Sequence, residues 1–237
     1  IADPTFVAIA KEQGIDGCVI GSIVNSVPFW ALTKNPNVPQ ITNAAMLAPY
    51  SVATFSAPST AYTVQTEMFK EANLPTNIRQ GAFGTLLPML DTGNADIALE
   101  LEPNVSIAVA NGAKVVYSFA DKYPDFTFTG ITTSKKTIDE PEIVQHFINA
   151  ITKAEKFAHE YPDSAAYYMA ELYPDVNKNI IAQAIKRMVD SNTLPQNAVI
   201  SPEAWKQAVA LRHRMGDLKS LDNIESVLDM NFAEKAR

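Results

Sequence analysis

The sequence contains a single cysteine, Cys18, among its 237 residues. One cysteine excludes an internal disulfide and any cluster of thiolate metal ligands. It lies in the apolar run Cys18-Val19-Ile20, where a small buried side chain is expected. The three histidines show neither the H-x-x-x-H nor the H-E-x-x-H spacing of a zinc site. We therefore predict no metal and no cofactor.

Long apolar runs and basic blocks are also missing. No segment has the length and apolarity of a membrane-spanning helix, and no signal peptide is recognisable, so we predict no direct membrane insertion in this segment. The net charge is −7, with 19 basic and 26 acidic residues. An acidic chain without a basic patch is a poor partner for nucleic acid. The first residue is Ile1 rather than Met, which indicates a chain that has been processed, trimmed or excerpted.

The common catalytic signatures are absent as well. The sequence has no G-x-S-x-G elbow and no dinucleotide-binding glycine pattern. Asp3 and Glu102 are imaginable as a carboxylate pair for acid–base chemistry. Their occurrence at equivalent places in an internal repeat favours architecture or ligand polarity instead. We therefore predict that the protein is not an enzyme.

The stretch from Ser51 to Phe69 contains the clearest local signal. A short apolar strand is followed by the polar turn Ser56-Ala57-Pro58-Ser59-Thr60 and then by a helix in which Tyr62, Gln65, Thr66 and Phe69 recur at helical spacing. Ser and Thr are typical N-cap residues. The start of this helix is therefore expected to attract an anion or the polar end of a ligand.

Strands and helices alternate through the first half of the chain, and the segment after Pro141 is helical. Strands are expected at residues 18–24, 27–33, 52–55, 78–83, 96–101, 115–119 and 126–132, and helices at residues 6–13, 60–69, 85–91 and 102–110. This alternation predicts an α/β fold with a largely parallel sheet covered by helices.

An internal repeat indicates two lobes. The segment Ala2-Asp3-Pro4 precedes a short apolar helix, a Gly and a strand, and Leu101-Glu102-Pro103 precedes the same series. A repeat of this size predicts two lobes of like construction. A strand-helix-strand unit comes before the second copy but not before the first. We therefore expect the first lobe to be N-terminally incomplete, without its first strand-helix-strand unit.

The order of the segments predicts how the lobes divide the chain. Residues 1–33 are expected to form the first part of lobe 1, residues 34–50 a connector, residues 51–125 lobe 2, and residues 126–237 a crossover strand and C-terminal helices that belong mainly to lobe 1. Ligands in open α/β sheets bind beyond the carboxyl ends of strands. The turns at those ends are expected to face a cleft between the lobes, and the loop Gly81-Ala82-Phe83-Gly84 adds Phe83 to the candidate ligand-binding residues.

Several segments together resemble a known family. The stretches DPTFVAIAKEQG, VPFWALTKNP, VATFSAPSTAYT, GNADIALELEP and FTFTGITTSKK are similar, in this order, to the substrate-binding proteins of ABC importers for sulfonates, taurine, nitrate and thiamine-pyrimidine precursors. The resemblance implies a two-lobed periplasmic-binding-protein fold of type II that closes on a solute and delivers it to a membrane permease. It also implies a periplasmic or otherwise extracytoplasmic location, with or without a lipid anchor.

The resemblance also implies site residues. It places Asp3 and Thr5 at the rim of the first lobe, Trp30 near the hinge, Ser56, Ser59 and Thr60 at the helix start of the second lobe, and Glu102 opposite. The expected ligand is a small organic or oxyanion solute, such as a sulfonate, nitrate or a pyrimidine-like molecule. Two alternatives remain open: an enzyme of pyrimidine-precursor biosynthesis on the same fold, and the ligand-sensing domain of a regulator.

Overall fold

The computed structural model describes residues 1–236, apart from the side chain of Lys135. The chain divides into two compact units. Unit 1 contains residues 1–27, 121–173 and 185 onward, and unit 2 contains residues 28–120 and 174–184. The chain therefore passes from one unit to the other four times.

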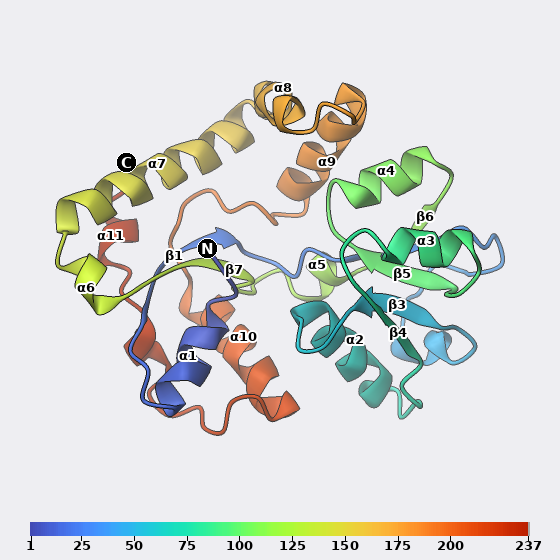
Figure 1. The fold of residues 1–237 in the computed structure, drawn as a ribbon, viewed down its shortest axis with the longest axis horizontal. Helices are drawn as coiled ribbons and strands as arrows, with labels where there is room; N and C mark the ends of the chain where they lie inside the picture. Colours follow the sequence, from blue (N-terminus) through green and yellow to red (C-terminus); the bar gives the residue numbers. More distant parts are fainter. Residues whose placement is uncertain (237) are drawn as a thin grey trace. The chain divides into compact units, whose positions relative to one another are not determined.

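Unit 2 is built on a five-stranded sheet in the order β4-β3-β5-β2-β6. Its strands are β2 (Trp30–Thr33), β3 (Val52–Phe55), β4 (Ile78–Gly81), β5 (Ile97–Glu100) and β6 (Lys114–Ser118), and its helices are η1 (Ala44–Leu47), α2 (Thr60–Glu71), α3 (Leu86–Asp91) and α4 (Asn104–Ala110). Helix α2 packs on β3, α3 on β5 and β3, and α4 on β6 and β2. Figure 1 shows α2 on one face of the sheet and α3 and α4 on the other.

The sheet of unit 2 is mixed, which corrects the expectation of a largely parallel sheet. Strand β3 pairs in parallel with β4 and β5, whereas β2 pairs antiparallel with both β5 and β6. The four residues of β2 are all buried. An apolar strand that is covered on both faces suits a central position whichever way it runs, so its composition does not reveal its direction.

Unit 1 has a smaller sheet and more helices. Strands β1 (Cys18–Val24) and β7 (Thr129–Thr133) pair antiparallel, and its helices are α1 (Thr5–Glu12), α6 (Lys135–Ile138), α7 (Pro141–Glu160), α8 (Pro162–Leu172), α10 (Pro202–Met215), η2 (Ile224–Val227) and α11 (Asn231–Glu234). Helices α5 (Phe119–Lys122) and α9 (Lys178–Asp190) contain residues of both units. Ala2 forms a single antiparallel bridge with Gly130 of β7.

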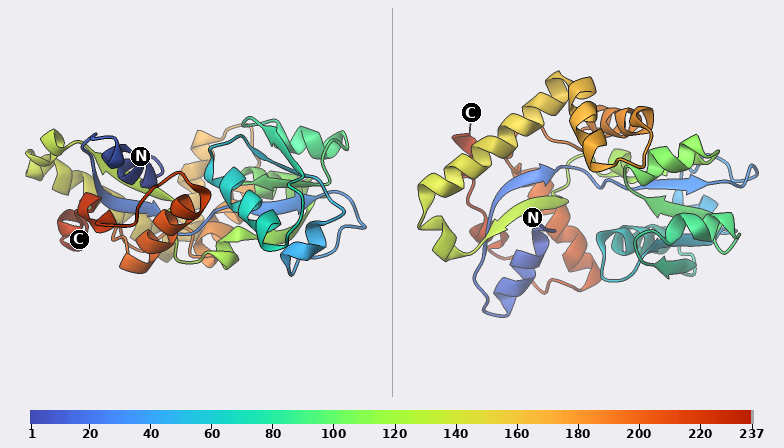
Figure 2. Two further views of the ribbon diagram at one scale, coloured as in Figure 1. Left: turned by 90° about the horizontal axis from the view of Figure 1, so that it is seen from below. Right: turned by 45° about the horizontal axis from the view of Figure 1, so that its top comes forward.

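The core of unit 1 follows the alternation of β1. Val19 packs in a cluster with Trp205 and Val209 of α10, and its neighbours Cys18 and Ile20 pack on the other side in a cluster with α7 residues. Figures 1 and 2 show α7 on one face of β1 and α1 and α10 on the other. Cys18 is buried, which confirms the reading of this residue as a core side chain.

The two units divide the chain differently from the expected lobes. Residues 28–33, expected in lobe 1, lie in unit 2 because β2 is hydrogen-bonded between β5 and β6. The expected connector also lies in unit 2, where the Ile41 amide donates to the carbonyl of Val116 in β6. No helix among residues 1–236 is long and apolar enough to cross a membrane.

Candidate functional site

The carboxyl ends of the three parallel strands in unit 2 form the candidate site, which we call the carboxyl edge. It comprises the last residues of β3, β4 and β5 and the turns that follow them at residues 56–59, 82–85 and 101–103. Parallel strands bring their carboxyl ends to one edge of the sheet. The structure therefore places the Ser56, Phe83 and Glu102 turns at the same edge of unit 2.

The turn after β3 leads into the start of helix α2. Ser59 is the N-cap, and its hydroxyl oxygen accepts a hydrogen bond from the Tyr62 amide at 3.2 Å. The same hydroxyl lies 3.2 Å from the carbonyl oxygen of Phe55, to which it donates. The N-cap type expected from the sequence is thus confirmed at Ser59. The helix itself begins at Thr60, so Pro58 lies before the cap rather than in the first turn.

Further contacts hold this turn in place. The Ala57 amide donates to the side-chain oxygen of Gln80 in β4 at 3.0 Å. The side chain of Ser56 is exposed, and Thr60 is buried. The turn is therefore anchored to the neighbouring parallel strand while Ser56 stays accessible to solvent.

Glu102 caps the helix that follows β5. Its Oε2 accepts from the Ser106 amide at 3.0 Å, and its Oε1 accepts from the Ser106 hydroxyl at 2.9 Å. A carboxylate near the first turn of a helix satisfies amide groups that have no partner within the helix. Glu102 thus has a structural role in the acid-Pro motif in addition to its proposed role towards a ligand.

Two residues before Glu102, the carboxyl group of Glu100 lies at the end of β5 and is completely buried. Its Oε2 accepts from Asn104 Nδ2 at 3.2 Å and from the Leu101 amide at 3.4 Å. Its Oε1 has no hydrogen-bond partner among the described residues. Burial raises the pKa of Glu100 above its ordinary value, and the hydrogen bonds from Asn104 and Leu101 partly oppose this rise.

Aromatic rings line the same edge. Trp30 of β2 is the register partner of Glu100 and is 3% exposed. The ring centroids of Phe29 and Phe55 lie 6.0 Å apart, and those of Phe55 and Phe83 lie 4.5 Å apart. Phe29 and Phe55 are buried, whereas Phe83 is 73% exposed. These ring contacts lead from the core of unit 2 to its surface.

The acid-Pro motif of unit 1 is tied to the C-terminal part of the chain. Asp3 Oδ1 accepts from the amide of Thr5 at 2.9 Å and from its hydroxyl at 2.5 Å, and Asp3 Oδ2 forms an ion pair with Arg212 Nη2 at 2.7 Å. Arg212 is 2% exposed and also contacts Asp217 and the Phe6 ring. Asp3 therefore balances a buried guanidinium group.

The eight predicted site residues fall into two groups. Asp3 and Thr5 contact each other in unit 1, and the other six lie in unit 2, namely Trp30, Ser56, Ser59, Thr60, Phe83 and Glu102. Their role in ligand binding, and the enclosure of a ligand by both lobes, stay predictions.

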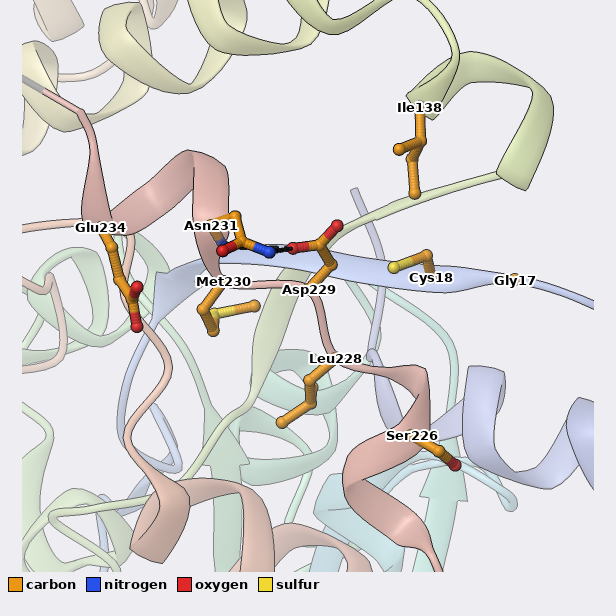
Figure 3. A pocket seen from close by; sticks show the side chains of 9 residues that line it. All are labelled: Gly17, Cys18, Ile138, Ser226, Leu228, Asp229, Met230, Asn231 and Glu234. Atoms are coloured by element: carbon orange, nitrogen blue, oxygen red, sulfur yellow. Dashed lines mark hydrogen bonds between the residues drawn. The ribbon is translucent and has the colours of Figure 1, made fainter.

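A pocket of about 370 Å³ lies wholly within unit 1 and contains none of these residues. Figure 3 shows its lining, which includes Cys18 of β1, Asp229 and Asn231. The Asn231 amide group donates to Asp229 Oδ1 at 2.7 Å, so these two polar groups already satisfy each other. Among the described residues, no group of three or more His, Cys, Asp or Glu side chains is placed to hold a metal ion.

Sequence reasoning missed Glu100 and Arg212. Glu100 stands inside the apolar strand of the segment DIALELEP, where a charged residue is a signal in itself because burying it requires compensation. Arg212 comes more than two hundred residues after its partner Asp3, and no local pattern connects residues so far apart.

No family model and no curated protein matches this sequence. Solved structures do match. The ligand-binding component of an ABC-type import system from Staphylococcus aureus, with zinc bound, has a TM-score of 0.76 and 11% sequence identity over 100% of this chain and 79% of that chain. The periplasmic aliphatic sulphonate-binding protein from Escherichia coli has a TM-score of 0.73 and 14% identity over 96% of this chain and 78% of that chain.

An enzyme shares the same fold. The desulfurization enzyme DSZB has a TM-score of 0.66 and 12% identity over 92% of this chain and 78% of that chain. The chain therefore has the two-lobed α/β fold of periplasmic binding proteins, as expected from the sequence. Most of the reported neighbours are binding proteins, and this fold also carries an enzyme.

Proposed function

We propose that the protein is the solute-binding receptor of an ABC importer, which captures a small organic or oxyanion solute and delivers it to the membrane permease. The observation that carries the proposal is the fold, which matches import-system binding proteins over nearly the whole chain. The proposed location is periplasmic or otherwise extracytoplasmic. A sulfonate is the first ligand to test, because one of these neighbours is described as binding aliphatic sulphonates.

The carboxyl edge supports this function through two kinds of contact. Helix α2 has 12 residues, and its start is capped by Ser59. The start of a helix contributes about 0.3 to 2 kcal/mol to the binding of an anion. Micromolar binding requires about 8 kcal/mol. The apolar surface of rings such as Phe83 has to supply much of the rest, at about 25 cal/mol for each Å² removed from water. A solute that has both an anionic group and an apolar part would make both kinds of contact.

A binding role is favoured over an enzyme on this fold because Asp3 and Glu102, the two acids that the sequence offers as an acid–base pair, are occupied by structural contacts. Glu102 caps α4 through Ser106, and Asp3 is paired with Arg212. A carboxylate that acts as a general base must lie within hydrogen-bond reach of the substrate proton that it removes. Both carboxylates of the candidate pair are instead committed to contacts within their own units.

A thermal-shift and calorimetry panel tests the proposal. Methanesulfonate, taurine, benzenesulfonate, nitrate and a hydroxymethylpyrimidine are added to the full chain. A ligand at a hundred times its Kd stabilises the folded state by about 2.7 kcal/mol, which raises the melting temperature measurably. Mass spectrometry of the recovered ligand tests whether the protein converts it. We expect the mass of the ligand to be unchanged. A panel without any stabilisation contradicts the receptor role, and a converted ligand indicates an enzyme.

A further inference from the structure

Gln80 connects the edge strand of the unit 2 sheet to the turn that precedes helix α2. It is the last residue but one of β4, which lies at the end of the sheet beside β3. Its side-chain oxygen Oε1 accepts from the Ala57 amide at 3.0 Å. A backbone N–H group is a donor, so the oxygen of the Gln80 amide group has to face Ala57. The backbone therefore fixes which way this side-chain amide points.

The nitrogen of the same amide group is left for another partner. Nε2 carries two N–H donors, and the bond to Ala57 is the side-chain hydrogen bond that Gln80 makes among residues 1–236. Gln80 is exposed, so a solute can reach Nε2 from the solvent. Ser56, which precedes the peptide group held by Gln80, is exposed as well. Two accessible polar groups therefore lie at this part of the carboxyl edge, and the direction of one is set before any ligand binds.

Phe83 supplies an accessible apolar surface three residues after Gln80. The turn that carries it is closed by Thr85, whose amide and hydroxyl donate to the Ala82 carbonyl at 3.1 and 2.8 Å. The Phe83 ring packs on Phe55 with 4.5 Å between the ring centroids, yet the residue is 73% exposed. Much of the ring is therefore open to solvent while its position is held from below. Such a ring suits contact with the apolar part of a ligand.

We propose that Gln80 is a specificity-determining residue of the carboxyl edge, whose Nε2 donates a hydrogen bond to an acceptor atom of the solute while the open part of the Phe83 ring contacts the solute's apolar part. The Ser56 hydroxyl is the second polar contact. The inference rests on the receptor function proposed above and narrows its ligand class to molecules that join an acceptor group to an aromatic part. Ammonium compounds are disfavoured, because they offer no acceptor to an N–H donor.

Titration calorimetry of the full chain with benzenesulfonate and hydroxymethylpyrimidine, the two aromatic members of the panel, tests the role of Gln80. Gln80→Glu keeps an acceptor oxygen for the Ala57 amide but replaces the Nε2 donors by a second, negatively charged acceptor. Its Kd for the aromatic ligand should therefore rise about tenfold or more above the wild-type value, the scale of one lost hydrogen bond. Benzylammonium should bind more tightly to Gln80→Glu than to the wild type.

Gln40→Glu is the matched control, because it makes the same change of charge at another exposed glutamine of unit 2. Gln40 precedes Ile41, whose amide donates to Val116 of β6, and β6 lies at the opposite end of the sheet from β4. Neighbouring strands are about 4.8 Å apart, so the distance across the sheet exceeds the Debye length of about 10 Å at 0.1 M salt. The Kd of this variant should stay within about threefold of the wild-type value.

A nuclear magnetic resonance titration gives a second measurement on the wild-type chain, which does not depend on how a variant folds. The side-chain N–H signals of Gln80 are assigned by their loss in Gln80→Glu, and the aromatic ligand should shift them with the Kd that calorimetry gives. A purely structural Gln80 would only anchor the turn through Oε1. Signals that stay in place when the ligand saturates the protein overturn the inference.

The outcomes separate the inference from the receptor function. Equal affinity of the wild type and Gln80→Glu for the aromatic ligand overturns the role of Gln80 and leaves the receptor function standing. Binding only of panel members without an aromatic part, or a wild-type preference for benzylammonium, also overturns the inference, because recognition would then not use the Phe83 ring or the Gln80 donor. A wild-type chain that binds no member of the panel contradicts the receptor function together with the inference.

Discussion

Glu155 of helix α7 provides the sharpest stability test. Its side chain is 7% exposed, and neither carboxyl oxygen has a hydrogen-bond partner among the described residues. Burial raises its pKa from the ordinary value of 4.5 to about 8. The folded protein therefore holds a proton at neutral pH that the unfolded chain releases. Glu155→Gln replaces this group with a neutral side chain of the same size.

The sign and size of the effect follow from proton linkage. Between pH 4.5 and about 8 the folded state binds more protons than the unfolded state at this position, so the free energy of unfolding falls as the pH rises. The fall is about 1.4 kcal/mol for each pH unit, or about 5 kcal/mol over the whole interval. Below pH 4.5 both states are protonated and this loss disappears. A total stability of about 5 to 15 kcal/mol is typical of a domain, so the effect is large.

Urea unfolding at pH 5, 6, 7 and 8 measures this dependence. The chain has two tryptophans, and Trp205 lies in a core cluster of unit 1, the unit that also contains Glu155. A Trp30→Phe background leaves Trp205 as the fluorescence reporter for that unit. The stability of Glu155→Gln relative to its parent should increase with each step in pH. Any fixed cost of burying the amide group shifts all four differences equally and leaves the slope intact.

Glu160→Gln is the matched control, because Glu160 is an exposed glutamate of the same helix. Its difference from the parent should be the same at all four pH values. A Glu155→Gln difference that is equally flat refutes the reasoning, since it means that Glu155 is ionised in the folded protein.

Three further predictions concern the two units. Ser59→Ala with Thr60→Ala should weaken an anionic ligand several-fold in calorimetry, through hydrogen bonds lost at the helix end; unchanged affinity makes this turn purely structural. Asp3→Asn should lower the free energy of urea unfolding by about 1 to 3 kcal/mol, because Arg212 loses its 2.7 Å carboxylate partner and keeps Asp217 at 3.2 Å; an unchanged free energy contradicts a buried pair. Gly81→Ala should lower the melting temperature, since its Cβ would lie 2.6 Å from the Thr85 hydroxyl oxygen; an unchanged value contradicts this close packing.

Local sequence patterns predict the elements well and their long-range arrangement less well. The expected strand at residues 18–24 matches β1, and Ser59 is the N-cap that its residue type suggests. Strand β2 begins at Trp30, three residues after the expected start, and runs antiparallel to β5 and β6. Strand direction depends on partners from distant parts of the chain, which a periodic pattern does not contain.

The same contrast holds for the candidate site. Ser59 was recognisable because an N-cap residue type stands before the helix start, and Glu102 because the acid-Pro motif occurs twice in the sequence. Glu100 was hidden between apolar residues of a strand, and the contact of Asp3 with Arg212 joins the two ends of the chain. Residues of the first kind follow from local backbone chemistry. Those of the second kind follow only from tertiary packing.

The positions of the two sheets along the sequence also determine the order in which the units can fold during synthesis. All five strands of unit 2 lie between residues 30 and 118, so its sheet can assemble once that segment has left the ribosome. In unit 1 the amide of Ser22 donates to the carbonyl of Ala198, and the core around Val19 includes residues of α10 and η2. Unit 1 must therefore wait for nearly the whole chain. Domains generally fold as units in the order of synthesis, but here the unit that contains residue 1 is the last to be completed.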